Sequence, residues 1–260
     1  MRADIAGIDT NYQFFAKKNA PTVILLHGWL NDWQAWSSVI QPLSNDFQLV
    51  VPDLPGFGAS TFIEKPWLQT RSYAQWLATF ITYLKLDTKQ PVIVIGHSFG
   101  GKVAALYAAH YQNTSEPPVS KIILVDAAGM PDDLPTKTVF KQSLIRLIPK
   151  PLKHFLPQSL KYRILDKMGV ATDHLQSNRV QRQVLQATIR ENISADVTQI
   201  TLPTLLVWGQ HDEATPLHQG YDFHVKIPSA KLEIFEKSGH FPFQDEPKKF
   251  IETITTFINA

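Results

Sequence analysis

Short apolar runs recur along this 260-residue chain, and their recurrence constrains the fold more than any other feature. The runs are apolar on successive residues rather than alternating, as expected for strands that are covered on both faces of a sheet. They are Thr22–Leu26, Phe47–Val51, Pro91–Ile95, Lys121–Val125, Pro203–Val207 and Lys231–Phe235. We therefore predict that these six segments are strands.

Amphipathic segments separate the runs. One apolar stripe steps by three or four residues and consists of Tyr73, Trp76, Leu77, Phe80, Ile81 and Leu84, which is typical of a helix. The residues from 250 to 258 repeat this pattern. Alternating strands and helices predict an α/β fold with a mostly parallel sheet and helices on both faces.

Residues 130–196 interrupt this alternation. They contain no strand candidate but several helix-like pieces divided by prolines at positions 131, 135, 149, 151 and 157. Proline lacks a backbone donor and disfavours helix in the residue before it, so short helices joined by turns are expected. A simple crossover needs only about a dozen residues. We therefore predict a helical cap at 130–196, inserted in an α/β core formed by 1–129 and 197–260.

Charge is unevenly distributed. The predicted cap holds eleven Lys and Arg against six Asp and Glu, whereas the whole chain has a formal charge of only +2. The overall balance does not indicate a nucleic-acid binder. A solvated helix face explains the basic cap most simply. An acidic substrate, an acidic carrier protein and a membrane surface are the alternatives that this charge leaves open.

The composition also bears on cellular context. The chain has no cysteine, which excludes a disulfide framework, a thiolate metal site and a catalytic thiol. The first 18 residues lack the apolar core of a secretory signal, and no stretch reaches the roughly 18 apolar residues of a membrane span. We expect a cytoplasmic protein without stable membrane insertion.

The segment Gly96-His97-Ser98-Phe99-Gly100 carries the strongest chemical signal. It lies between a predicted strand and an apolar helix pattern, the context in which G-x-S-x-G forms a sharp turn that exposes a reactive serine. Small residues are needed there because neighbouring backbone passes close to the turn. Ser98 would then lie at the positive end of a helix, where a developing anion is favoured.

A serine hydroxyl needs a base to remove its proton and a third group to orient that base. Asp212 follows the predicted strand Pro203–Val207, and His240 follows Lys231–Phe235. The carboxyl ends of parallel strands share one edge of the sheet, where open α/β sheets build their sites. We therefore predict that Ser98, Asp212 and His240 meet at this edge.

At these residues the chain resembles the α/β-hydrolase superfamily, over nearly its whole length. The resemblance is carried by His27-Gly28-Trp29, by the run from Pro52 to Ser60, by the turn at Ser98, and by the run from Gly239 to Phe243. It implies that Ser98 is the nucleophile, His240 the base and Asp212 the orienting acid. Some members take the acid from the preceding strand, which makes Asp126 the alternative.

Other polar residues near these motifs are expected to have structural roles. His97 lies inside the turn, and we expect its side chain to point away from Ser98. His27 is expected to hold its own loop, and Asp53 to stabilise the turn rich in proline and glycine that follows it.

Acyl transfer also needs donors for an anionic oxygen, and we predict the backbone N–H groups of Trp29 and Phe99. Five aromatic residues are equally candidates for an apolar pocket or for the core: Trp29, Trp33, Trp36, Phe99 and Phe241. No metal-ligand spacing and no dinucleotide fingerprint is present, so we expect neither a metal nor a cofactor.

These observations predict a serine hydrolase that cleaves a small-molecule carboxylic ester through an acyl-enzyme on Ser98. The alternatives are a carbon–carbon bond hydrolase of ring-cleavage diketones, a peripheral membrane lipase and a non-catalytic ligand receptor on the same fold. The sequence leaves the acyl group and the alcohol of the substrate open.

Overall fold

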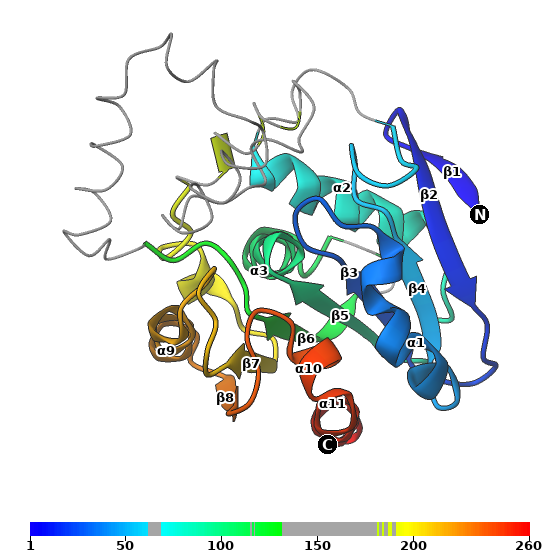
Figure 1. The fold of residues 1–260 in the computed structure, drawn as a ribbon. Coiled ribbons are helices and arrows are strands. Elements are labelled where there is room, and N and C mark those ends of the chain that lie inside the picture. The colour runs from blue at the N-terminus through cyan, green and yellow to red at the C-terminus, as the bar shows by residue number, and fades with distance from the viewer. Residues whose placement is uncertain are drawn as a thin grey trace, which may run out of the picture.

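Figure 1 shows the computed structural model of the protein, which describes residues 1–61, 69–114, 116, 118–131, 181, 184, 187–188 and 191–260. The predicted cap at 130–196 lies mostly outside these residues and stays a prediction. No helix in the described ranges has both the length and the apolar character needed to cross a membrane.

Eight strands form one sheet in the order β1-β2-β4-β3-β5-β6-β7-β8. In this order, every pair of neighbouring strands from β4 through β3 to β8 is parallel. Strand β2 is antiparallel to both of its neighbours, β1 and β4. The strands are β1 (Arg2–Ile5), β2 (Ile8–Phe15), β3 (Thr22–Leu26), β4 (Gln48–Pro52), β5 (Val92–His97), β6 (Val119–Val125), β7 (Thr204–Gly209) and β8 (Ala230–Phe235). The predicted mostly parallel sheet is therefore confirmed.

All six predicted strands are present, with ends displaced by two residues at most. Strand β8 differs from the expectation of continuous burial, because it lies at the sheet edge and, before the buried Phe235, its residues alternate between partly covered and exposed. The β1–β2 hairpin was not predicted. Its buried residues alternate with exposed ones, and it turns at Ala6 and Gly7, both with positive φ, so it shows no continuous apolar run.

Helices cover both faces of the sheet (Figure 1). Helices α2 (Thr70–Tyr83), α3 (Phe99–His110) and α9 (Leu217–Lys226) pack on one face. Helix α1 (Ser37–Ser44), with α10 (Pro242–Asp245) and α11 (Pro247–Asn259), packs on the other. Two 3-10 helices, η1 (Trp33–Trp36) and η2 (Val197–Gln199), complete the described elements. The α2 and α11 helices confirm the two predicted apolar stripes.

The strands divide their side chains between two apolar cores. In β3, Ile24 and Leu26 point into the core under α2 and α3, while Val23 and Leu25 point into the core under α1 and α11. This division requires apolar residues at successive positions, which is why the central strands show no polar alternation.

Register aligns the carboxyl ends of the central strands. His97 of β5 is level with Val125 of β6, which is level with Val207 of β7. The backbone N–H of Ser98 donates to the Val125 carbonyl oxygen at 2.9 Å, and the N–H of Asp126 donates to the Val207 carbonyl oxygen at 3.0 Å. The loops that follow β5, β6 and β7 therefore begin side by side.

Candidate active site

Ser98 occupies a strained turn between β5 and α3. Its φ of 53° and ψ of −113° lie outside the conformations that non-glycine residues ordinarily adopt. Its carbonyl oxygen accepts from the N–H of Lys102 at 3.0 Å and of Ala128 at 3.1 Å, which fixes the turn against the loop after β6. The Ser98 side chain is partly exposed, and its hydroxyl bonds to no other described residue. The hydroxyl is therefore free to meet a base or a substrate.

Close backbone contacts explain the glycines around this serine. A Cβ at Gly100 would lie 2.5 Å from the carbonyl oxygen of Leu26 and 2.6 Å from that of His27. A Cβ at Gly28 would lie 3.3 Å from the Cβ of Ser98. The loop after β3 thus touches the serine turn, as the need for small residues there predicted.

His240 and Asp212 come together from the loops after β8 and β7. Their contact joins His240 Nδ1 and Asp212 Oδ2 at 2.8 Å. The imidazole is about one-fifth exposed, whereas the carboxylate is fully buried. Asp212 therefore fixes one ring nitrogen of His240, while the imidazole stays partly exposed.

Asp212 is held as an anion by several donors. Its Oδ1 accepts from the N–H groups of Ala214 and Thr215 at 2.7 and 3.0 Å, and the Thr215 hydroxyl lies 2.6 Å from Oδ2. Burial by itself would raise the pKa of Asp212, but the bonds from His240 and Thr215 outweigh it and leave the pKa below its ordinary value. The sequence did not predict Thr215, because its contact with Asp212 depends on the conformation of the loop that joins them.

The loop that carries His240 is fixed from two sides. Asp245 Oδ2 accepts from the N–H of Gly239 at 2.9 Å, and Glu246 Oε2 accepts from the Ser238 hydroxyl at 2.8 Å. On the other side, His97 Nε2 lies 2.7 Å from the carbonyl oxygen of His240. That carbonyl can only accept, so His97 Nε2 carries the proton.

His97 is therefore a neutral, buried support of the His240 loop. Burial and the nearby His240 ring lower its pKa to about 3. Its ring centroid lies 4.7 Å from that of His240 and 4.9 Å from that of Phe241. The side chain thus packs against the loop of the predicted base, a contact between residues 143 positions apart that the sequence did not reveal.

Asp126 lies at the end of β6 and is completely buried. Its Oδ1 accepts from the N–H of Gly209 at 2.9 Å, and its Oδ2 has no hydrogen-bond partner in the described part of the chain. Burial, followed by the charge of Asp212, raises its pKa well above the ordinary value. The ring nitrogen of His240 is bonded to Asp212 and not to Asp126.

The predicted donors for an anionic oxygen flank the serine turn. Phe99 is the first residue of α3, so its N–H lies among those that a helix leaves without an internal acceptor. The N–H of Trp29 donates to no other described residue. Gly28, which precedes Trp29, lies against Ser98, which precedes Phe99, so the two donors lie on adjoining segments of the chain.

Aromatic rings surround this edge of the turn. Trp29 packs edge-on against Phe57 and Phe99, with centroids 4.8 and 5.2 Å away, and Tyr73 packs against Phe99 at 5.1 Å. Phe57 and Tyr73 are not among the five aromatic residues that the sequence offered as pocket candidates. Trp36, one of those five, is fully buried and stacks on Phe243 at 4.3 Å, so it belongs to the core.

The end of the predicted cap meets this aromatic group. A small pocket is lined by residues of the loop at 55–57, by Tyr73 and by the side chains of Gln181 and Val184. Gln181 Nε2 donates to the carbonyl oxygen of Gly56 at 2.9 Å. Lys102 Nζ, buried in α3, donates to the carbonyl oxygens of Thr188 and Glu191 at 2.7 and 2.6 Å.

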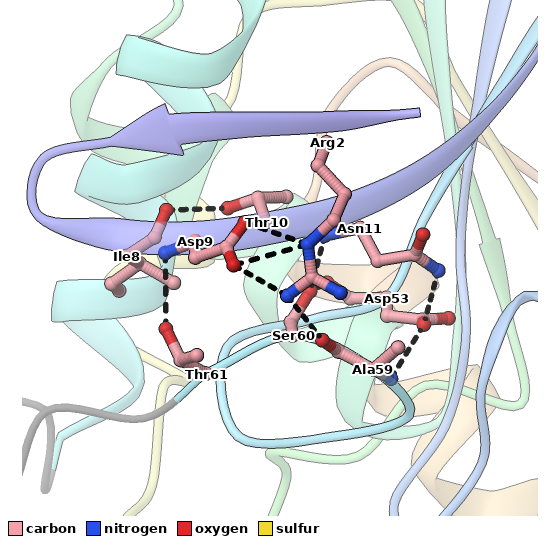
Figure 2. Close-up of polar contacts among 9 residues, drawn as sticks. All are labelled: Arg2, Ile8, Asp9, Thr10, Asn11, Asp53, Ala59, Ser60 and Thr61. Atoms are coloured by element: carbon pink, nitrogen blue, oxygen red, sulfur yellow. Dashed lines mark hydrogen bonds and ion pairs between the residues drawn. The ribbon is translucent and has the colours of Figure 1, made fainter.

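His27 and Asp53 have the structural roles that were predicted. His27 Nε2 accepts from the N–H of Leu54 at 2.9 Å, which ties the loop after β3 to the loop after β4. Asp53 Oδ2 accepts from Asn11 Nδ2 at 2.8 Å and from the N–H of Ala59 at 2.9 Å (Figure 2). Its Oδ1 accepts from the N–H of Trp33 at 2.8 Å, so the carboxylate stabilises its own turn.

One group of side chains in the described ranges has the composition of a metal site. Ligand atoms of His97, Asp126 and His240 lie within 4.8 Å of one another. His97 Nε2 and His240 Nδ1 are, however, already engaged with the His240 carbonyl oxygen and with Asp212. The arrangement suits a proton network better than a metal ion.

Most of the chain matches the model of one protein family. Residues 23–253 match the model of the alpha/beta hydrolase family, which covers the sheet from β3 to β8 and every residue of the site. The chain belongs to the alpha/beta hydrolase family.

Individual hydrolases are similar to this one at modest identity. The monoacylglycerol lipase of Homo sapiens is 26% identical over 261 residues, which cover 92% of this chain and 75% of the lipase. The pimeloyl-[acyl-carrier protein] methyl ester esterase of Vibrio campbellii is 25% identical, and the match covers 96% and 99% of the two chains. Among solved structures, an esterase from Exiguobacterium antarcticum matches with a TM-score of 0.72 at 25% identity, over 99% and 98% of the chains.

In this hydrolase the structure brings Asp212 and His240 into contact and presents Ser98 on the predicted turn. The roles of these three residues, and of the Trp29 and Phe99 donors, stay predictions.

Proposed function

We propose that this protein hydrolyses carboxylic esters through an acyl-enzyme on Ser98. The observation that carries the proposal is the 2.8 Å contact of His240 with the buried Asp212. The centroid of the His240 ring lies 4.7 Å from that of His97, the residue that precedes the strained and partly exposed Ser98. The named relatives, a lipase and two esterases, act on esters, which supports the same class of substrate here.

The first half of the reaction acylates the serine. His240 Nε2 takes the proton from Ser98 Oγ as that oxygen attacks the carbonyl carbon of the ester. The carbonyl oxygen becomes an anion, and the N–H groups of Trp29 and Phe99 stabilise it. When the bond to the alcohol oxygen breaks, His240 returns its proton to that oxygen and the alcohol leaves.

Water completes the cycle. His240 removes a proton from water, the resulting hydroxide attacks the acyl carbon, and the proton passes to Ser98 Oγ as the acid is released. In both halves a positive charge develops on His240. Asp212 stabilises this charge because its other donors keep it ionised within a buried site.

The aromatic residues indicate an apolar acyl group. Trp29, Phe57, Tyr73 and Phe99 form a contiguous set of rings on the side of the turn where Phe99 follows the nucleophile. Apolar walls with a few polar groups at one end are typical of pockets for small ligands. The basic composition of residues 130–196 leaves an acidic carrier as a second partner to be tested.

Hydrolysis of a short p-nitrophenyl ester tests the proposal. Ser98→Ala and His240→Ala are expected to abolish turnover, and Asp212→Asn to lower kcat at least a hundredfold. His211→Ala and Asp222→Asn are matched controls, because His211 is exposed next to Asp212 and Asp222 lies on α9 away from the contact. Both controls are expected to keep wild-type activity.

Three results would overturn this assignment. Full activity in Ser98→Ala would show that Ser98 is not the nucleophile. Loss of activity in Asp126→Asn, with Asp212→Asn unaffected, would show that Asp126 at the end of β6 is the acid that orients His240. A folded wild-type protein that turns over no ester, thioester or lactone but cleaves vinylogous diketones would be a carbon–carbon bond hydrolase instead.

A further inference from the structure

Asp126 is a buried carboxyl group that lacks the partners an anion requires. Its side chain is inaccessible, and only Oδ1 is bonded, to the N–H of Gly209 at 2.9 Å. Oδ2 has no partner among the described residues. A buried carboxylate oxygen without a donor carries the full desolvation cost, whereas a protonated oxygen needs an acceptor.

An acceptor lies beside it. The Thr215 hydroxyl lies 2.6 Å from Asp212 Oδ2 and 3.0 Å from the backbone carbonyl oxygen of Asp126, so it is nearer to Asp212. A ring nitrogen of His240, whose Nδ1 is bonded to Asp212 Oδ2, lies within 4.8 Å of the Asp126 carboxyl group. Asp212 is therefore an acceptor close to Asp126, and its charge contributes to the raised pKa of Asp126. The Asp212 carboxylate contacts His240, the N–H and hydroxyl of Thr215 and the N–H of Ala214, whereas the Asp126 carboxyl group accepts one bond. The donors therefore favour charge on Asp212 rather than on Asp126.

Two further titratable groups near Asp126 act in the same direction or are neutral. Asp245 adds negative potential from the loop after β8, next to that of Asp212. His97 is kept neutral by burial, and it lies with His240 within 4.8 Å of the Asp126 carboxyl group. Two adjacent carboxyl groups in a buried site resist double ionisation because their charges repel.

We propose that Asp126 is a positioning residue of the site: its carboxyl group keeps its proton and donates a hydrogen bond to Asp212, so that the pair holds one negative charge behind His240. The donated bond draws charge away from Asp212 and limits the basicity of the imidazole. Its kinetic test rests on the proposed function, whereas the protonation state can be measured without activity.

Asparagine is the variant that separates a neutral acid from an anion. In Asp126→Asn the amide oxygen can accept from Gly209 and the amide N–H can donate to Asp212, so a neutral acid is replaced in both roles. If Asp126 were ionised in the wild type, the same variant would remove a negative charge from the neighbourhood of His240.

Infrared difference spectroscopy at pH 7.5 gives the direct readout. The wild type is expected to show the carbonyl stretch of one protonated carboxylic acid, which Asp126→Asn removes and the control Asp222→Asn leaves in place. Absence of this band from the wild type, or its persistence in Asp126→Asn, overturns the proposal whatever the protein catalyses.

The pH dependence of kcat/KM gives the functional readout. Its acid limb follows protonation of His240. Asp126→Asn is expected to superimpose on the wild type, with kcat/KM within about twofold. Asp126→Ala, which removes the donor to Asp212, is expected to lower kcat about tenfold with little change in KM and to move the acid limb to higher pH.

Each kinetic outcome decides the question. An acid limb that moves to lower pH in Asp126→Asn shows that the residue was ionised and overturns the proposal. So does an Asp126→Ala profile identical to that of the wild type. If Asp126→Ala does not fold, the asparagine variant and the infrared band carry the test. If the wild type hydrolyses no ester, the proposed function fails and the infrared band still decides the protonation of Asp126.

Discussion

His97 is a buried imidazole whose proton is committed to the carbonyl oxygen of His240. Burial and the His240 ring lower its pKa to about 3, whereas in the unfolded chain the value is about 6.5. Between these values the unfolded chain binds one more proton than the folded protein, so the stability that the neutral ring contributes is present above about pH 6.5 and is lost as pH falls toward 3. The loss approaches about 1.4 kcal/mol per pH unit.

His97→Gln isolates this effect, because glutamine can offer a donor to the same carbonyl oxygen without titrating. Urea unfolding from pH 7 to pH 4 is the measurement, with the variant as the reference at each pH. We expect the free energy of unfolding of the wild type to fall relative to that of the variant as pH decreases. A difference that is constant with pH would show that His97 keeps an ordinary pKa.

At the scale of elements, the turn between β5 and α3 depends on its approach to the loop after β3. A methyl group at residue 100 would lie 2.5 Å from the backbone oxygen of Leu26, and backbone cannot yield as a flexible side chain can. Gly100→Ala is therefore expected to lower the free energy of unfolding by about 1–3 kcal/mol and to impair ester hydrolysis. Gly239→Ala is the matched control, because its methyl group would meet no atom closer than 3.8 Å. Equal stability of the two variants, measured by urea unfolding, would contradict this account of the turn.

Elements also show what the sequence could predict. Five of the six predicted strands were recognisable because burial on both faces requires consecutive apolar residues, as in β3 and β7. The β1–β2 hairpin escaped because only alternate residues, such as Ile5 and Ile8, contact the core. Ser98, Asp212 and His240 could be selected because each follows a strand. Thr215, and the contacts of His97 and Asp126, could not, because they depend on loop conformations and on which strands become neighbours.

At the scale of the whole molecule, stability is expected to come from apolar layers on both faces of the sheet. Phe250 of α11 is completely buried and packs against Phe235 and Phe243. Phe250→Ala is therefore expected to lower the free energy of unfolding by about 3–5 kcal/mol. Phe14, which is 37% exposed on β2, provides the comparison, and its replacement by alanine is expected to cost less than about 1 kcal/mol. Similar losses for the two variants in urea unfolding would show that α11 does not close a tightly packed core.

The identity of the nucleophile is the central claim, and peptide mapping after labelling with a fluorophosphonate tests it most directly. Cleavage after lysine releases residues 90–102, in which Ser98 is the only hydroxyl-bearing side chain. The account predicts one phosphonyl group per molecule, located on this peptide, and none on Ser98→Ala. Stable labelling of a different peptide, or no labelling of folded protein that hydrolyses esters, would contradict it.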